Sequence, residues 1–174
     1  MTDSKFAAQL TAQIGEEFAA HQQYVAVAAH YDALTMPQMA GLFFRQAKEE
    51  RGHAMMMIRY LLDVDAPVEI PAVEAPTSVF DGVVPPVELA LAQERRVTEQ
   101  IHTLTQIARE EGDFAAEQFM QWFIKEQVEE VATMQDLLAV AQRSGDDLND
   151  IENYVERELG GSDDDPTAPP MADD

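Results

Sequence analysis

The sequence predicts an all-α fold, namely a four-helix bundle with one long crossover and a short fifth helix. Three observations support this prediction. Four long segments repeat apolar residues at the three-to-four-residue spacing of a buried helix face. The first and third connections between them are short, whereas the second is long and rich in proline. This pattern is typical of a bundle whose second and third helices run parallel.

The first helix is expected from about Asp3 to Leu34 and the second from near Pro37 to Asp63. Proline suits a first helical turn, because the N–H that it lacks has no helical partner there. Both segments carry an apolar stripe, which indicates a buried face. The stripe residues are Phe6, Leu10, Ile14, Ala28 and Tyr31 in the first segment, and Phe43, Ala47, Met57 and Leu61 in the second.

The stretch DAPVEIPAVEAPTSVFDGVVPP follows, and its prolines exclude a continuous helix. The third helix is expected to start at the Pro85-Pro86 pair and to end near Gly112. Asp113 can cap the fourth helix by accepting hydrogen bonds from free backbone N–H groups, and that helix should run to about Arg143. A short fifth helix is expected over Leu148–Leu159.

The length of 174 residues favours one domain, predicted over residues 1–160. Residues 161–174, GSDDDPTAPPMADD, are acidic and poor in apolar side chains, so they are predicted to be a disordered tail. No cysteine is present, and the start of the chain does not resemble a signal peptide. We therefore expect a cytoplasmic protein without disulfides or thiolate metal sites.

The net charge is −22, with 33 acidic against 11 basic residues. Such a surface repels the phosphates of nucleic acids and anionic membranes but attracts cations. No apolar run approaches the roughly 20 residues that span a bilayer. Neither nucleic acid nor a membrane is therefore expected as a partner.

Each of the four long stripes carries one acid, namely Glu17, Glu50, Glu94 or Glu130. His53 lies three residues after Glu50 and shares its helix face. A buried carboxylate costs several kcal/mol unless it is paired, and four in one core would repel each other. Two multivalent cations would remove this repulsion, and carboxylates with one imidazole suit iron or manganese. The alternative is a metal-free helical adaptor whose acids face water.

The segments EEFAAHQQY, KEERGH, QERR and QWFIKEQVEE resemble the four ligand-bearing segments of the ferritins. The resemblance covers Phe6 to Leu159 and is strongest to bacterial non-haem ferritins, particularly actinobacterial ones of the bacterioferritin-B type. It implies an iron-storage ferritin with ferroxidase activity. Such a protein oxidises Fe(II) with dioxygen or peroxide at a di-iron centre and stores ferric mineral inside a hollow shell of 24 subunits.

The resemblance also assigns the ligands. One iron would be held by Glu17, Glu50 and His53. The second would share Glu50 as a bridge and use Glu94 and Glu130.

Five further residues are assigned by the same resemblance. Gln127 would lie beside the second iron, and Tyr24 at the edge of the centre, able to donate an electron or to hold a carboxylate. Glu49, Glu126 and Glu129 match an outlying third iron position. The alternative for these three acids is an ordinary solvated face.

Two positions differ from the pattern of the bacterioferritins, and they bear on the ligands of the second iron and on haem binding. Gln127-x-x-Glu130 stands where bacterioferritins carry a second E-x-x-H, which leaves the second iron with all-oxygen ligands. Arg51 stands where bacterioferritins bind haem through methionine, so no haem is expected; a haem bacterioferritin is the runner-up. Dps-like proteins lack the fifth helix, and the rubredoxin module of rubrerythrin needs cysteines.

The remaining partners are less well defined by the sequence. Glu117 matches an acid of the three-fold channel of ferritin shells. Met120 occupies the position of the next acid of that channel, so the sequence does not assign the route by which iron enters. The reductase that would release iron is not specified. An encapsulin shell is an alternative partner, although the C-terminus shows no clear targeting peptide.

Overall fold

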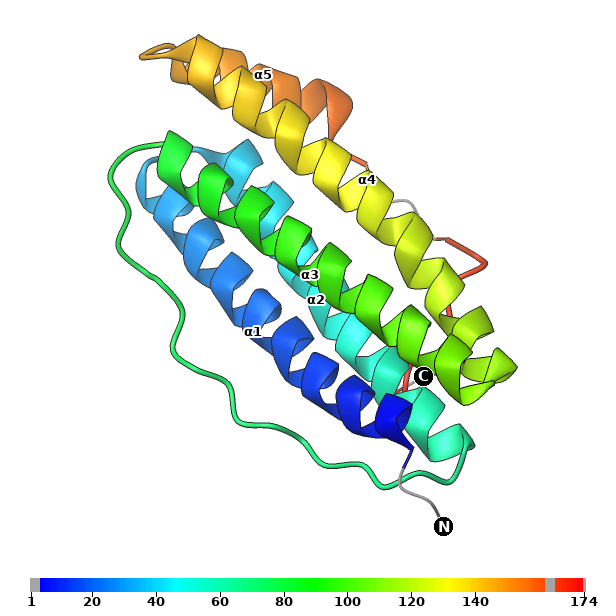
Figure 1. The fold of residues 1–174 in the computed structure, drawn as a ribbon. Coiled ribbons are helices and arrows are strands. Elements are labelled where there is room, and N and C mark those ends of the chain that lie inside the picture. Colours follow the sequence, from blue (N-terminus) through cyan, green and yellow to red (C-terminus); the bar gives the residue numbers. More distant parts are fainter. Residues whose placement is uncertain (1–3, 162–164, 174) are drawn as a thin grey trace.

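The computed structural model describes residues 4–161 and 165–173, which form five α-helices and no strand. Figure 1 shows α1 to α4 side by side as a bundle, with α5 at the end where α4 finishes. The predicted all-α fold is confirmed, with helix ends close to those expected; Asp3 lies outside the described residues. The helices are α1 Lys5–Ala33, α2 Pro37–Asp63, α3 Val84–Glu111, α4 Phe114–Ser144 and α5 Leu148–Glu158.

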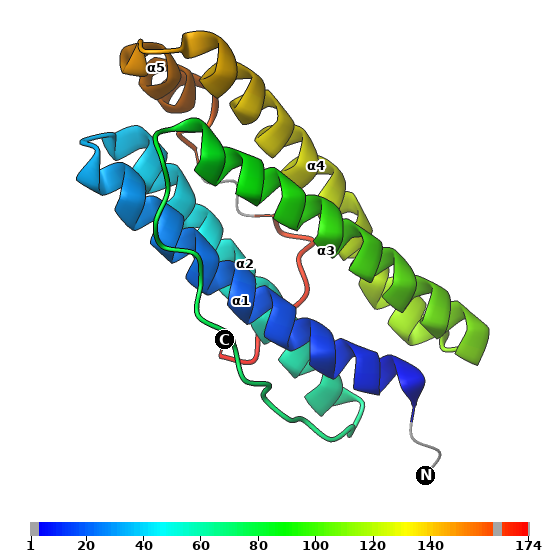
Figure 2. The ribbon, with the colours of Figure 1, turned by 60° about the vertical axis from the view of Figure 1, so that its left-hand side comes forward.

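The long crossover, residues 64–83, runs along the bundle beside α1 (Figures 1 and 2). Gln23 fixes it in the middle: its amide donates to the Thr77 carbonyl at 2.8 Å and accepts from the Thr77 N–H at 2.9 Å. A Cβ on Gly15 would lie only 3.0 Å from Cβ of Pro71, so glycine permits the close approach of the crossover. These contacts hold the crossover as it returns to the end of the bundle where α2 begins. Because α3 starts there, α2 and α3 run parallel.

Side chains satisfy the free backbone groups at the helix ends. Asp113 accepts from the Ala116 N–H at 2.9 Å and caps α4, as the sequence predicts. Glu111 at the end of α3 accepts from the backbone N–H groups of Lys5 and Phe6 at 2.8 and 3.2 Å. This carboxylate links the first turn of α1 to the end of α3. Its negative charge also interacts favourably with the positive N-terminal end of the α1 dipole.

The core consists of two apolar clusters, one toward each end of the bundle. The cluster beside α5 includes Tyr24, Tyr31, Phe43, Leu137 and Ile151. The cluster at the opposite end includes Phe6, Ile14, Ile101, Met120 and Phe123. Several buried polar side chains on α1 to α4 belong to neither cluster.

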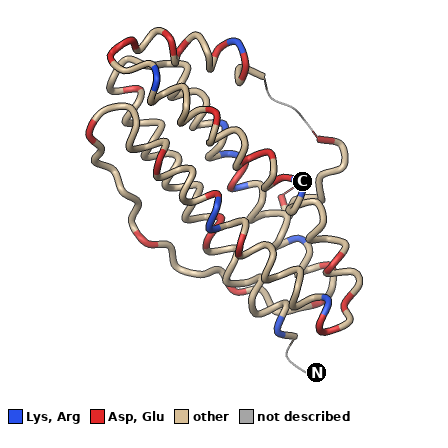
Figure 3. The backbone as a smooth tube through the Cα atoms, turned by 45° about the horizontal axis from the view of Figure 1, so that its top comes forward, with Lys and Arg blue, Asp and Glu red and all other residues tan. Residues whose placement is uncertain are grey.

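Figure 3 shows acidic residues along the whole chain and far fewer basic ones.

Residues 165–173, here called the C-terminal strap, lie against Arg51 and Met55 of α2 and Trp122 of α4. Residues 162–164 and 174 of the predicted tail lie outside the described residues. None of the helices in the described ranges combines the length and apolarity needed to cross a membrane.

Candidate metal centre

Each of the four bundle helices places one acid in the core. Glu17 of α1, Glu50 of α2, Glu94 of α3 and Glu130 of α4 are exposed by 1, 2, 1 and 5%, respectively. His53 of α2 is exposed by 4%. All five lie on the apolar stripes of their helices, so the packing that buries the stripes also turns these polar groups inward.

Glu17, Glu50 and His53 form a close cluster. One ligand atom of each lies within 4.8 Å of the others. His53 Nδ1 is 3.6 Å from Glu17 Oε2 and 3.4 Å from Glu50 Oε2. Glu17 Oε2 and Glu50 Oε1 are buried without a hydrogen-bond partner. Two buried carboxylates, each with one unpartnered oxygen, and a neighbouring imidazole are a donor set that suits a divalent cation.

Glu94 and Glu130 are buried on the neighbouring helices but stand outside this three-residue cluster. The Tyr24 hydroxyl donates a hydrogen bond to Glu94 Oε1. Gln127 Nε2 donates to Glu94 Oε2 and to the Glu94 carbonyl, both at 3.2 Å. Tyr24 and Gln127 thus hold Glu94 in place, and Gln127 also lies one turn from Glu130 on α4.

The electrostatics of the centre favour bound protons. Burial raises the pKa of the Glu50 carboxyl well above its ordinary value, and the charge of Glu94 raises it further. Burial raises the pKa of Glu130 in the same way, again with a contribution from Glu94. Burial lowers the pKa of His53, but Glu17 and Glu50 outweigh it and raise this pKa well above its ordinary value. A cation entering the centre would therefore displace protons.

Two neighbours of the centre were missed by the sequence-based assignment. Gln13 Nε2 donates to Glu17 Oε1 at 2.9 Å and so orients that carboxylate. The Trp122 ring packs edge-on against the His53 imidazole, with centroids 5.6 Å apart. Helical spacing could have identified both, because Gln13 lies one turn before Glu17 and Trp122 one turn before Glu126.

Glu49, Glu126 and Glu129, the acids of the outlying third iron position, are here called the flanking acids. They are less buried than the four core acids. Glu49 and Glu129 are exposed and Glu126 is half-buried. The surrounding protein still removes water from around the carboxyl groups of Glu49 and Glu126, and this desolvation raises the pKa of both above their ordinary values. Lys125 Nζ approaches Glu129 Oε1 at 3.9 Å. Among the described residues these acids do not join a close ligand cluster of the kind that Glu17 belongs to.

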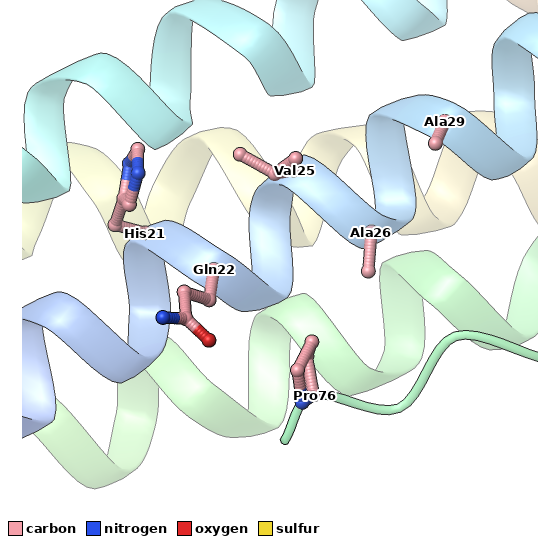
Figure 4. Close-up of a pocket in the computed structure, with 6 residues that line it drawn as sticks. All are labelled: His21, Gln22, Val25, Ala26, Ala29 and Pro76. Atoms are coloured by element: carbon pink, nitrogen blue, oxygen red, sulfur yellow. The ribbon is translucent and has the colours of Figure 1, made fainter. Parts of the chain in front are cut away.

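A shallow hollow on the surface contains none of the predicted ligands. It has a volume of about 360 Å³ and lies between α1 and the crossover (Figure 4). His21, Val25 and Pro76 line it, and His21 Nδ1 is 2.6 Å from the Ala47 carbonyl oxygen. Its polar lining is sparse, and the buried acids lie elsewhere, so we do not assign the metal centre to it.

Comparison with known proteins agrees with this geometry. A family model described as "Ferritin-like domain" matches residues 7–144. The chain is 51% identical over 170 residues to "Ferritin BfrB" of Mycolicibacterium smegmatis, covering 98% of this chain and 94% of that protein. It is 38% identical over 151 residues to "Bacterial non-heme ferritin" of Staphylococcus aureus, covering 87% of this chain and 90% of that protein.

A solved ferritin structure has the same fold as this chain. An open pore ferritin from Archaeoglobus fulgidus superposes with a TM-score of 0.86 at 29% identity, over 90% of this chain and 97% of that one. The matched family model, the close bacterial relatives and the five-helix fold with its buried Glu/Glu/His cluster lead to one conclusion. The chain belongs to the ferritin family.

Proposed function

We propose that this ferritin stores iron by oxidising Fe(II) at the buried centre and depositing Fe(III) as mineral inside a hollow shell of 24 subunits. The observation that carries the proposal is the buried cluster of Glu17, Glu50 and His53, in which one carboxylate oxygen of each glutamate has no hydrogen-bond partner. The cysteine-free sequence suits a reducing compartment, so we place the activity in the cytoplasm.

We assign the ligand roles that the resemblance to the ferritins implies. Glu17 and His53 would bind the first Fe(II), and Glu50 would bridge to a second, which Glu94 and Glu130 complete. Two Fe(II) ions give up one electron each. Dioxygen accepts both electrons with two protons to become hydrogen peroxide, or hydrogen peroxide accepts two electrons and two protons to become two waters. The protein supplies geometry and negative charge, which stabilise the higher charge of the Fe(III) product.

The second position would bind iron less firmly than the first. Its ligands are all oxygens, because Gln127 stands where a second histidine would otherwise lie. Gln127 donates its amide N–H to Glu94 and thereby helps to orient this carboxylate. A site with weaker ligation suits iron that is oxidised and then moves on to the mineral, rather than a permanent cofactor.

Particle size and iron content test the proposed function directly. Purified metal-free protein is given Fe(II) in air and then separated by size, with iron assayed in each fraction. We expect a large hollow particle that holds many more iron atoms per chain than the centre can bind. A small oligomer that retains no iron would overturn the storage function.

The flanking acids should affect turnover more than the first oxidation. The triple change Glu49→Ala, Glu126→Ala, Glu129→Ala leaves the buried cluster intact, so the first two irons per chain should be oxidised at close to the wild-type rate. Oxygen-only ligands exchange iron readily. The variant should therefore show an altered ratio of oxygen consumed to iron oxidised, and a slower recovery between successive iron additions.

The matched control removes the same charge from a different face. Glu88, Glu99 and Glu110 are exposed acids of α3, and their replacement by alanine should leave the stoichiometry and the recovery unchanged. If the flanking triple variant regenerates like the wild type, the three acids are only a solvated face.

Haem should not bind at the α2 position that bacterioferritins use. Arg51 occupies this position and pairs with Asp173 at 2.9 Å, so the side chain at this position carries no thioether. Protein purified from haem-rich cells should lack a Soret band. A band equivalent to one haem per two subunits would show that another methionine has taken the role.

A further inference from the structure

The C-terminal strap reaches the metal centre through the single tryptophan of the chain. Asp165 Oδ2 accepts a hydrogen bond from the Trp122 indole N–H at 3.0 Å. Trp122 in turn packs edge-on against His53, with an interplanar angle of 73°. A continuous contact therefore runs from the strap to a side chain of the buried cluster.

The Asp165 carboxylate is oriented before it meets the indole. Its Oδ1 accepts from the Thr167 N–H at 2.8 Å and from the Thr167 hydroxyl at 2.6 Å. Its Oδ2 is then left for Trp122 and for Lys125, whose Nζ lies 3.4 Å away. The hydrogen bonds from Thr167 and Trp122 hold the pKa of this carboxyl below its usual range, so it accepts as an anion.

The rest of the strap is fixed to α2 on both sides of His53. Asp173 pairs with Arg51 at 2.9 Å, and the Ala172 N–H donates to the Met55 carbonyl at 3.1 Å. A Cβ on Gly52 would lie 3.5 Å from the sulfur of Met171. Among the described residues, α2 and α4 are not a closely packed helix pair, unlike α1–α2 and α3–α4. The strap thus bridges two helices that both supply proposed iron ligands.

We infer that Asp165 is a positioning residue of the centre: it holds Trp122 against His53 and so fixes the orientation of the imidazole. The inference rests on the proposed ferroxidase function. A histidine that binds a metal needs its ring held from outside, and loss of such outer contacts lowers affinity or activity even though the ligands stay in place. Here the outer contact is an aromatic ring, and the strap determines where that ring lies.

Asp165→Ala tests the inference with two independent readouts in the assembled protein. In the metal-free protein, the emission of Trp122 should shift to longer wavelength, because the indole N–H loses its carboxylate and meets water. Oxidation of the first two Fe(II) per chain should slow by roughly threefold or more, since misplaced groups lower the rate without being removed. Thr167→Val leaves Asp165 less well oriented and should move both readouts in the same direction by less.

The double variant and a control show whether the effect passes through Trp122. In a Trp122→Phe background, Asp165→Ala should cause no further slowing. Asp173→Ala removes the same charge from the far end of the strap and should leave the emission unshifted.

Each contrary result overturns the inference: unchanged emission and rate in Asp165→Ala, equal slowing in both backgrounds, or an equal shift in Asp173→Ala. If the wild type itself oxidises no Fe(II), the proposed function fails instead. The emission of the metal-free protein still reports on the Asp165–Trp122 contact in that case.

Discussion

Replacing Glu50 or His53 by alanine should slow the rapid oxidation of Fe(II) by an order of magnitude or more. Glu50 is the proposed bridge between the two irons, and His53 supplies the one nitrogen ligand of the close cluster. Without either, the two irons are no longer held side by side, so the paired electron transfer is lost. Stopped-flow absorbance at two Fe(II) per chain measures the effect.

The shell should still assemble in both variants. Burial and the charge of Glu94 disfavour the ionised form of Glu50, so replacing this residue removes a carboxyl group whose burial is unfavourable in the metal-free core. We expect an unchanged or higher Tm for metal-free Glu50→Ala. Glu88→Ala, an exposed change on α3, serves as the control for oxidation rate. Wild-type oxidation rates in Glu50→Ala and His53→Ala would refute the assignment of the centre.

The affinity of the centre for a cation should fall as the pH is lowered. Each proton that the cation must displace makes the affinity fall about tenfold per pH unit. Glu50, Glu130 and His53 have pKa values well above their ordinary ones in the metal-free protein. They therefore retain protons at a pH where free carboxylates and imidazoles have lost them. A cation must displace these protons, so its affinity rises with pH and falls as the pH is lowered.

Calorimetry with Zn²⁺ as a redox-inert probe measures this competition. Titrations between about pH 6 and 8, in buffers of different ionisation enthalpy, give the number of protons released. Glu130→Gln carries no titratable group at this position and should release fewer protons than the wild type. Binding that releases no protons and does not depend on pH would contradict the described electrostatics of the centre.

The fold could be predicted from the sequence because its determinants are local. The apolar stripes specify four helices, and the prolines of the crossover exclude a helix where the chain must return along the bundle. Pro37 and Asp113 mark helix starts by the backbone groups that they lack or satisfy, and both starts are confirmed. The contact of Glu111 with α1 could not be predicted, because it joins residues more than a hundred positions apart.

The candidate site was predictable for a similar reason. An acid inside an apolar stripe must turn inward with it, and the structure buries all four such acids. Their roles as ligands remain part of the proposal. The strap is different, because its acidic and proline-rich composition predicts disorder. A few specific contacts, such as Asp165 with Trp122, place residues 165–173 against the bundle, and composition carries no information on such contacts.

The most direct test of the di-iron centre is anomalous diffraction from crystals loaded with Fe(II) in the absence of oxygen. The proposed di-iron centre predicts two peaks per chain, about 3.5–4 Å apart as in other two-metal sites. One should lie among Glu17, Glu50 and His53, and the other among Glu50, Glu94 and Glu130. Iron peaks confined to exposed acids, with none beside His53, would contradict it.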